Sequence, residues 1–327
     1  MIKFFRQSYI VQYVMIALMV LAFWLPTFIA GKVPVGLSSP VTPIYGAIER
    51  LLDFSPYMQL AFAFLLMLLE AAVINAVLVD NQIVGKVSTM GAFVFVILMN
   101  LTRTQVNFYP FALATLFILL MLRMVFLVYT SQKPEIDLLK AGIYTAFASM
   151  CYFPSIFLVF WMMIALSIAH KGGLRLQLIP IVGFLGVYFF YFTGIYLFGD
   201  FLATIHGYRD WFTSLHFTIS GFNLKNIILL SLLVVATVML LFMGGSGNFE
   251  KTVAVRTKLT QSVILLLFGV LLLFFGGNVL LNGLVFIGLS IVIAYEFSYM
   301  GNTGWANLFL VIFLLLVFAN HYYFKLL

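Results

Sequence analysis

One short polar segment separates two long apolar runs: Asn100-Leu101-Thr102-Arg103-Thr104-Gln105-Val106-Asn107-Phe108-Tyr109-Pro110. The apolar run Ser88–Met99 precedes this segment, and the apolar run Phe111–Tyr129 follows it. A polar turn placed between such runs predicts the tip of a helical hairpin in a membrane.

The first arm of this hairpin is short for a membrane span. Ser88–Leu101 would measure ~21 Å as a helix, whereas the hydrocarbon core of a bilayer is ~30 Å thick. Neighbouring helices must shield such an arm, or it must end in a wet cavity. We therefore expect Arg103 to lie below the outer membrane surface and to face a cavity.

The composition of the chain indicates an all-α integral membrane protein. Of 327 residues, 64% are hydrophobic and 8% are charged, whereas a soluble domain has about 25% charged residues. The long apolar runs favour a polytopic helical bundle, because a β-barrel would show short alternating segments. The net charge of +7 comes from basic residues spread along the chain, so no basic stripe predicts nucleic-acid binding.

The sequence predicts no metal site and no cofactor. Cys151 is the single cysteine, which excludes an internal disulfide and a cysteine-based zinc site. The four histidines are not spaced as a ligand cluster on one helix.

We predict eleven spans in a single transmembrane domain, residues 1–327, with no soluble domain. Lys3 and Arg6 flank the first span and predict a cytoplasmic N-terminus, and the resemblances given below imply the inner membrane of a bacterium. Eleven basic residues then fall inside and six outside. The expected spans are Tyr9–Ala30, Tyr57–Leu78, Ser88–Met99, Phe111–Tyr129, Leu138–Met150, Ile156–Ala169, Leu178–Phe198, Ile227–Phe242, Ser262–Phe275, Val279–Ala294 and Trp305–Asn320.

The first outer loop, Gly31–Pro56, contains an expected interfacial helix. Apolar residues recur at helical spacing between Val41 and Phe54, and charged residues fall on the other face. This pattern is typical of an amphipathic helix in the membrane interface. The second large outer loop, Gly199–Asn226, mixes aromatic and charged residues and is expected to be interfacial as well.

Candidate functional residues lie in these loops and in one span. Glu70 is an intramembrane charge, for which a structural role is favoured over a functional one; a protonated or paired carboxyl would suit either. The loop residues are candidate acids (Glu49, Asp53, Asp210) and candidate ligand-binding residues (Arg103, Arg209, His206). Carboxylates could perform acid–base chemistry and arginines could bind phosphate, although all six could be ordinary solvated loop residues.

The order of segments resembles a known enzyme class. A basic N-terminus, one span, the loop helix Val41–Phe54 and then short-armed hairpins resemble the N-terminal half of C-type glycosyltransferases, over residues 1–200. Residues 201–327 would be additional C-terminal helices. The resemblance implies a polyprenyl-phosphate sugar as substrate and a catalytic carboxylate early in the first outer loop. Gly31–Thr42 contains no acid, so Glu49 and Asp53 are the nearest candidates.

Two short motifs resemble an uncharacterised family of bacterial polytopic membrane proteins. They are Asn81-Gln82-Ile83-Val84-Gly85-Lys86 and Tyr152-Phe153-Pro154. This resemblance implies no activity.

Three hypotheses about function follow. The first is a glycosyltransferase-like protein that handles lipid-linked sugars at the outer face during envelope glycan assembly. The second is a transporter or lipid flippase, which would have charges in several spans and an internal repeat. The third is a non-catalytic membrane partner of an envelope-assembly complex.

Overall fold

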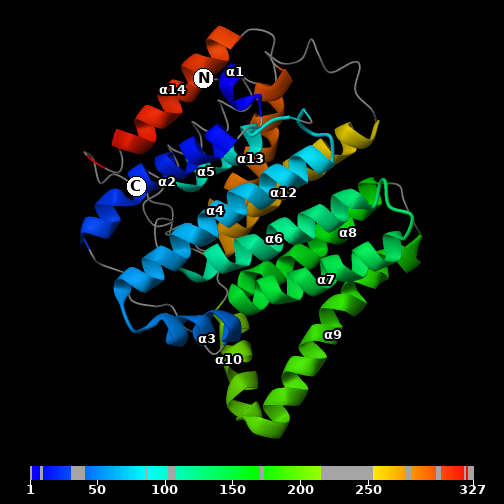
Figure 1. Ribbon diagram of the computed structural model, residues 1–327. Helices are drawn as coiled ribbons and strands as arrows, with labels where there is room; N and C mark the ends of the chain where they lie inside the picture. The colour runs from blue at the N-terminus through cyan, green and yellow to red at the C-terminus, as the bar shows by residue number, and fades with distance from the viewer. Residues whose placement is uncertain are drawn as a thin grey trace.

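A computed structural model describes residues 2–7, 10–30, 41–85, 87–101, 108–169, 173–214, 253–276, 282–299, 303–319 and 322. Every regular element in these ranges is a helix (Figure 1). The elements are α1 (Ile2–Phe5), α2 (Ile10–Ala30), α3 (Pro43–Leu52), α4 (Pro56–Asp80), α5 (Met90–Met99), α6 (Pro110–Leu127), α7 (Pro134–Cys151), η2 (Phe153–Phe157), α8 (Leu158–Ile168), α9 (Leu174–Phe198), α10 (Phe201–Thr213), α12 (Val253–Gly276), α13 (Asn282–Tyr299) and α14 (Thr303–Ala319).

Five of these helices are long and apolar enough to cross a membrane: α2, α4, α6, α9 and α12. Shorter apolar helices, among them α5, α8 and α13, lie between them. An all-helical architecture with long apolar helices is therefore confirmed. The number of eleven spans remains a prediction, because the expected span Ile227–Phe242 lies outside the described residues.

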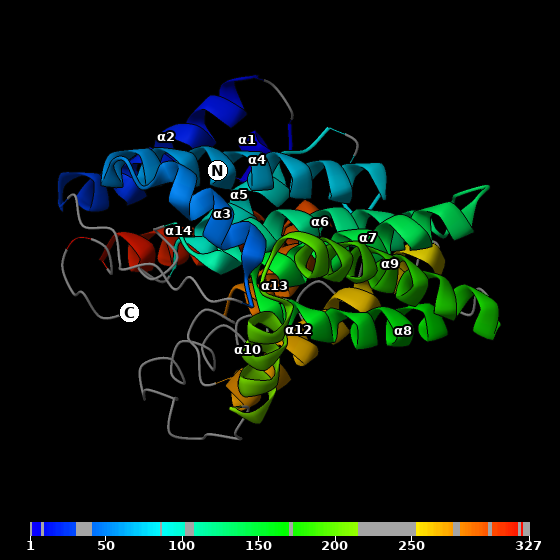
Figure 2. The ribbon, with the colours of Figure 1, turned by 90° about the horizontal axis from the view of Figure 1, so that it is seen from below.

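The long helices form a layered bundle. Figure 2 shows α2 and α4 along one side, α8 and α12 along the opposite side, and α6 and α7 between them. The closest helix pairs include α6 with α7 and α7 with α9. Glycines permit the second pairing, because a Cβ atom at Gly142 of α7 would overlap the backbone of Pro180 in α9, and one at Gly183 would overlap the backbone of Leu139. Small residues let backbones approach closely in membrane bundles.

The short helix α5 is completely enclosed. All ten of its residues are buried, and α2, α4, α13 and α14 pack around it. Shielding by neighbouring helices, one of the two outcomes expected for a short arm, is therefore observed for α5. The other outcome, a wet cavity at the end of the arm that Arg103 would face, falls on residues outside the described ranges.

The helical boundaries differ from expectation at three places. Gly199–Asn226 was expected to be a loop, but Phe201–Thr213 forms α10. The helix α12 begins at Val253, inside the expected inner loop, and α13 continues to Tyr299, so Glu296 is helical. Charged residues suggested loops here, whereas Lys258 of α12 is buried and its Nζ donates 2.9 Å to Oδ1 of Asn81.

The N-terminal segment is attached to the last two described helices. The backbone N–H of Ile2 donates to Oδ1 of Asn307 in α14 (3.0 Å), and the Arg6 guanidinium donates through Nε and Nη2 to the carbonyl of Phe297 in α13 (3.2 and 2.8 Å). The hydroxyl of Thr89 also donates to the carbonyl of Phe5 (3.2 Å). The contacts of Ile2 and Arg6 join residues 305 and 291 positions apart in the sequence.

Candidate functional site

The segment that leads into α6 lies beside α4. Phe108, two residues before α6, packs edge-on against Phe62 of α4 with a ring-centroid distance of 5.5 Å. Phe62 lies six residues into α4, so Phe108 contacts that helix ~9 Å from its beginning. Arg103 itself lies outside the described residues.

The helix α3 covers the segment that leads into α6. Tyr45 is buried and stacks on Phe108 at 5.1 Å, and its hydroxyl donates to Oε1 of Glu49 at 3.3 Å. Burial, followed by the charge of Glu49, raises the pKa of Tyr45. Leu51, in contrast, is 69% exposed. The helix therefore presents Tyr45 to the protein and Leu51 away from it, as expected for an amphipathic helix at a membrane surface.

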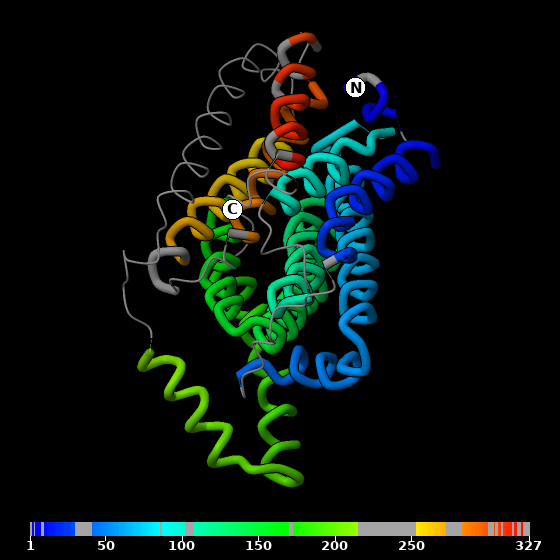
Figure 3. The backbone as a smooth tube through the Cα atoms, turned by 90° about the vertical axis from the view of Figure 1, so that its left-hand side faces the viewer, coloured from blue at the N-terminus to red at the C-terminus, as the bar shows by residue number. Residues whose placement is uncertain are grey.

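The helix α10 covers the neighbouring corner between α7 and η2. Figure 3 shows α9 and α10 projecting from the bundle as a V. Phe153 at the corner meets three rings of α10 edge-on, those of Tyr208 (5.0 Å), Trp211 (4.5 Å) and Phe212 (5.5 Å). Edge-to-face aromatic pairs of this kind each add about 0.5–1.5 kcal/mol beyond area burial.

The two covering helices, here called the cap helices α3 and α10, border one apolar cluster. Val41, immediately before α3, belongs to the same buried cluster as Phe153 and Tyr208, and Ile44 and Trp211 pack against it. Residues of the first and second large loops are therefore brought together at one end of the bundle, here called the cap end, which spacing alone did not predict.

The candidate charged residues lie at the cap end but do not contact one another. Glu49 is half-buried, whereas Asp53, His206, Arg209 and Asp210 are exposed. No hydrogen bond or ion pair joins the α3 acids to the α10 residues in the part of the chain that the structure describes. The cap helices are thus assembled, but their charged side chains do not form a closed catalytic constellation.

Three residues beneath the cap helices are buried, and their side-chain oxygens either lack a hydrogen-bond partner or can ionise. Glu70 of α4 is 1% exposed, and its Oε1 has no hydrogen-bond partner. The hydroxyl of Tyr152 at the α7–η2 corner is also buried without a partner. Burial raises the pKa of Tyr109 well above its ordinary value, with Glu70 and Tyr152 as the next causes. The sequence identified Glu70 by its charge but assigned no role to the tyrosines.

The other end of the bundle holds a separate set of polar contacts. The Arg123 guanidinium pairs with Asp80 at 2.9 Å, with both side chains about 40% exposed (41% and 43%). Near it, the Lys258 ammonium also lies 5.7 Å from the centre of the Tyr129 ring. These contacts fasten α6 and α12 to the end of α4 and leave the cap residues uninvolved.

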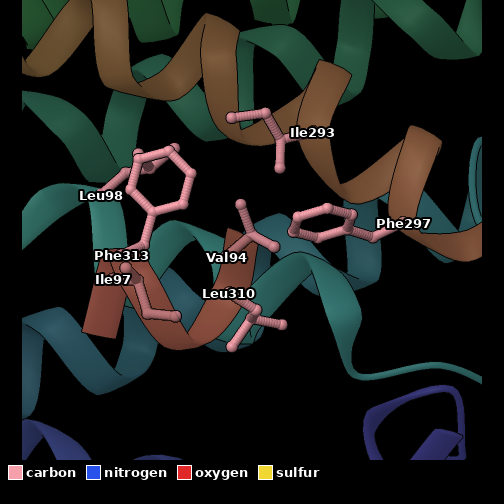
Figure 4. A pocket seen from close by; sticks show the side chains of 7 residues that line it. All are labelled: Val94, Ile97, Leu98, Ile293, Phe297, Leu310 and Phe313. Atoms are coloured by element: carbon pink, nitrogen blue, oxygen red, sulfur yellow. The ribbon is translucent and has the colours of Figure 1, made fainter. Parts of the chain in front are cut away.

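The described residues form no candidate metal centre, and a small cavity that they line away from the cap is apolar. No group of three histidine, cysteine or acidic residues able to hold a metal ion occurs among the residues that the structure describes. A cavity of about 10 Å³ between α5, α13 and α14 is lined only by apolar side chains, among them Val94, Ile293 and Phe313 (Figure 4). A space of this size and polarity stays dry.

Comparisons of the chain with protein-family models, curated proteins and solved structures find no match.

We predict that Phe153→Ala loosens α10 from the bundle. Removing a buried phenylalanine costs about 3–5 kcal/mol when the cavity cannot collapse, and Phe153 contacts three rings of α10. Trypsin cleavage after the exposed Arg209 should accelerate at least about tenfold, because each 1.4 kcal/mol is a factor of ten. The matched control is Phe190→Ala, which removes a side chain of α9 that is 76% exposed. Equal cleavage rates in the two variants would contradict the proposed anchoring.

Proposed function

We propose that this protein is a multi-span membrane protein that binds a lipid-linked, phosphate-bearing sugar at its cap end, in a glycosyltransferase-like role. The proposal rests on one observation. The helices α3 and α10 border the same apolar cluster, which contains Val41, Phe153 and Tyr208. Two helices from loops far apart in sequence thereby cover Phe108, just before α6, and Phe153, at the α7–η2 corner. A ligand with a lipid tail and a polar head suits such a place, because its tail lies in the bilayer and its head meets the interfacial helices.

The proposed roles follow from the chemistry of each side chain. Glu49, held by the Tyr45 hydroxyl, is the candidate acid–base group, with Asp53 and Asp210 as further acids. Arg209 and Arg103 are the candidate phosphate-binding residues, because a guanidinium forms paired hydrogen bonds to phosphate oxygens. His206 lies one turn from Arg209 and Asp210 on α10 and is the candidate residue for binding the sugar.

We further propose that the cap faces the outside of a bacterial inner membrane and that the N-terminus is cytoplasmic. The distribution of basic residues supports this orientation, since Lys133, Lys140, Arg175 and Lys258 fall toward the end of the bundle opposite the cap. Basic residues concentrate in cytoplasmic loops.

One observation favours the second hypothesis, a transporter or flippase. Glu70 is a buried intramembrane carboxyl without a partner on Oε1, and such groups often mark ion or proton pathways. This observation concerns α4 and the tips of the hairpins and does not involve the exposed residues of α10.

The test is native mass spectrometry of the purified full-length protein with an added polyprenyl monophosphate. We expect the phosphate to be retained in preference to the matching polyprenol. Arg103→Ala and Arg209→Ala should each reduce retention by about tenfold, the loss expected for one hydrogen bond to a charged group, and Arg103→Lys should reduce it less. The control is Arg175→Ala, which removes an exposed arginine at the far end of α9. Equal retention of polyprenol and polyprenyl phosphate would refute the proposed function.

A further inference from the structure

Glu70 occupies the middle of the face that α4 turns toward the rest of the bundle. Met67, Ala71 and Ile74 share this buried face, and α5 and α6 pack against α4. The carboxyl is withdrawn from solvent, and its Oε1 accepts no hydrogen bond. A charged carboxylate without partners is unfavourable in such surroundings, so the neutral acid is the stable form.

Two buried phenols lie at the start of α6 and at the α7–η2 corner. Tyr109 immediately precedes α6, which packs against α4. Tyr109 and Tyr152 are linked through the ring of Phe111, with centroid distances of 6.4 Å to Tyr109 and 5.5 Å to Tyr152. Glu70, Tyr109 and Tyr152 are therefore all buried, on elements that pack one against the next, α4 against α6 and α6 against α7.

The other ionisable groups around α4 have separate partners. On α6, Arg123 pairs with Asp80 at the far end of α4. On α2, the Tyr13 hydroxyl accepts from Nδ2 of Asn75, and on α3, Tyr45 bonds to Glu49. Beyond the end of α4, Lys258 of α12 bonds to Asn81. The helix α5 contains no ionisable residue.

We propose that Glu70 is a proton-exchanging site of this protein, with Tyr109 and Tyr152 as its hydroxyl partners at the hairpin tips. At rest the carboxyl keeps its proton. On release the O–H bond breaks, the electron pair stays on the carboxylate, and the proton passes to water or to a basic atom of a ligand arriving from the cap. The phenol hydroxyls then donate to the carboxylate and stabilise its charge, which also satisfies the buried Tyr152 hydroxyl.

A proton-exchanging carboxyl differs from a carboxyl that is only packed in the core in how often its proton exchanges with solvent. A carboxyl locked in a core keeps its proton for as long as the bundle stays closed, whereas an exchanging carboxyl meets solvent repeatedly. The distinction does not rest on the proposed function, because either an enzyme or a transporter could use a proton site beneath the cap.

Infrared spectroscopy of the full-length protein in lipid vesicles provides the test. The C=O stretch of a protonated carboxyl lies apart from the amide bands, and the difference between wild type and Glu70→Gln assigns it. If the glutamine variant does not fold, Glu70→Asp assigns the same band by moving it. We expect the band to be present at neutral pH and to shift within the time of a change from H₂O to D₂O buffer.

Variants of the two phenols separate proton exchange from burial. Tyr109→Phe and Tyr152→Phe should each slow the exchange about tenfold, the effect of losing one hydrogen bond to a charged group. Tyr188→Phe is the matched control, because its hydroxyl lies 2.8 Å from Oγ of Ser149 in a different cluster. A band that stays unshifted for hours would overturn the proposal, as would the absence of a protonated carboxyl band. Neither result would bear on whether polyprenyl phosphate binds at the cap.

Discussion

Replacing Glu70 by lysine should abolish accumulation of the folded protein, whereas Glu70→Gln should accumulate at close to the wild-type level. The position is 1% exposed and packed within α4, α5 and α6. A central lysine costs ~3 kcal/mol on insertion scales. A buried ammonium without a partner costs more, since its desolvation is not compensated. The total is comparable with the whole stability of a typical domain, about 5–15 kcal/mol.

Glutamine is the matched control because it keeps the shape of the neutral acid and carries no charge. The measurement is the amount of monodisperse protein recovered by size-exclusion chromatography from equal quantities of membrane. We expect less than about a tenth of the wild-type amount for the lysine variant, corresponding to a loss greater than 1.4 kcal/mol. Recovery of the lysine variant at the wild-type level would show that the position is wet and that Glu70 is not enclosed.

The second large effect is expected where α7 and α9 cross. A Cβ atom at Gly142 would overlap the carbonyl oxygen of Pro180 and lie 2.7 Å from its carbonyl carbon. These are backbone atoms, which cannot move aside as a side-chain end would. Gly142→Ala should therefore destabilise the bundle by about 3 kcal/mol, at the upper end of the usual cost of overpacking, and Gly142→Leu should prevent folding.

The control for this prediction lies on α9. Gly186 has open space where a Cβ atom would be placed, so Gly186→Ala should be neutral or stabilising by up to about 1 kcal/mol, the helix-propensity gain. Thermal unfolding in one detergent, monitored by the loss of monodisperse protein, compares the two alanine variants directly. If Gly142→Ala were as stable as Gly186→Ala, the close approach of α7 and α9 would be wrong.

Most of the fold could be predicted from hydropathy. The expected second span Tyr57–Leu78 corresponds to α4, Pro56–Asp80, and the amphipathic pattern from Val41 to Phe54 corresponds to α3. Both succeed because a long apolar run or a two-sided pattern has one favourable conformation at a membrane. The predicted start of α12 was wrong because a lysine is unfavourable in a membrane span. Lys258 is nevertheless buried in this helix, where its ammonium bonds to Asn81.

The candidate site was less predictable, because its assembly depends on aromatic contacts between distant segments. Phe153 and Tyr208 belong to elements that no local pattern connects, yet they share one cluster with Val41. A lone charge in an apolar run is conspicuous, so Glu70 could be identified from the sequence. Tyrosines are common at membrane interfaces, so Tyr109 and Tyr152 gave no signal that their hydroxyls lie beneath the cap.

The attachment of α1 to α13 and α14 has a consequence for the order of events during synthesis. The amide of Ile2 and the guanidinium of Arg6 bond to Asn307 and Phe297, which the ribosome adds almost 300 residues later. At about 5–20 residues per second, the first few residues wait tens of seconds before their partners exist. Until then the helices around α5 are incomplete, so these contacts form only when α13 and α14 have been synthesised. A nascent chain halted before Phe297 therefore has an unbound N-terminal segment. A membrane protease or chaperone could recognise this segment.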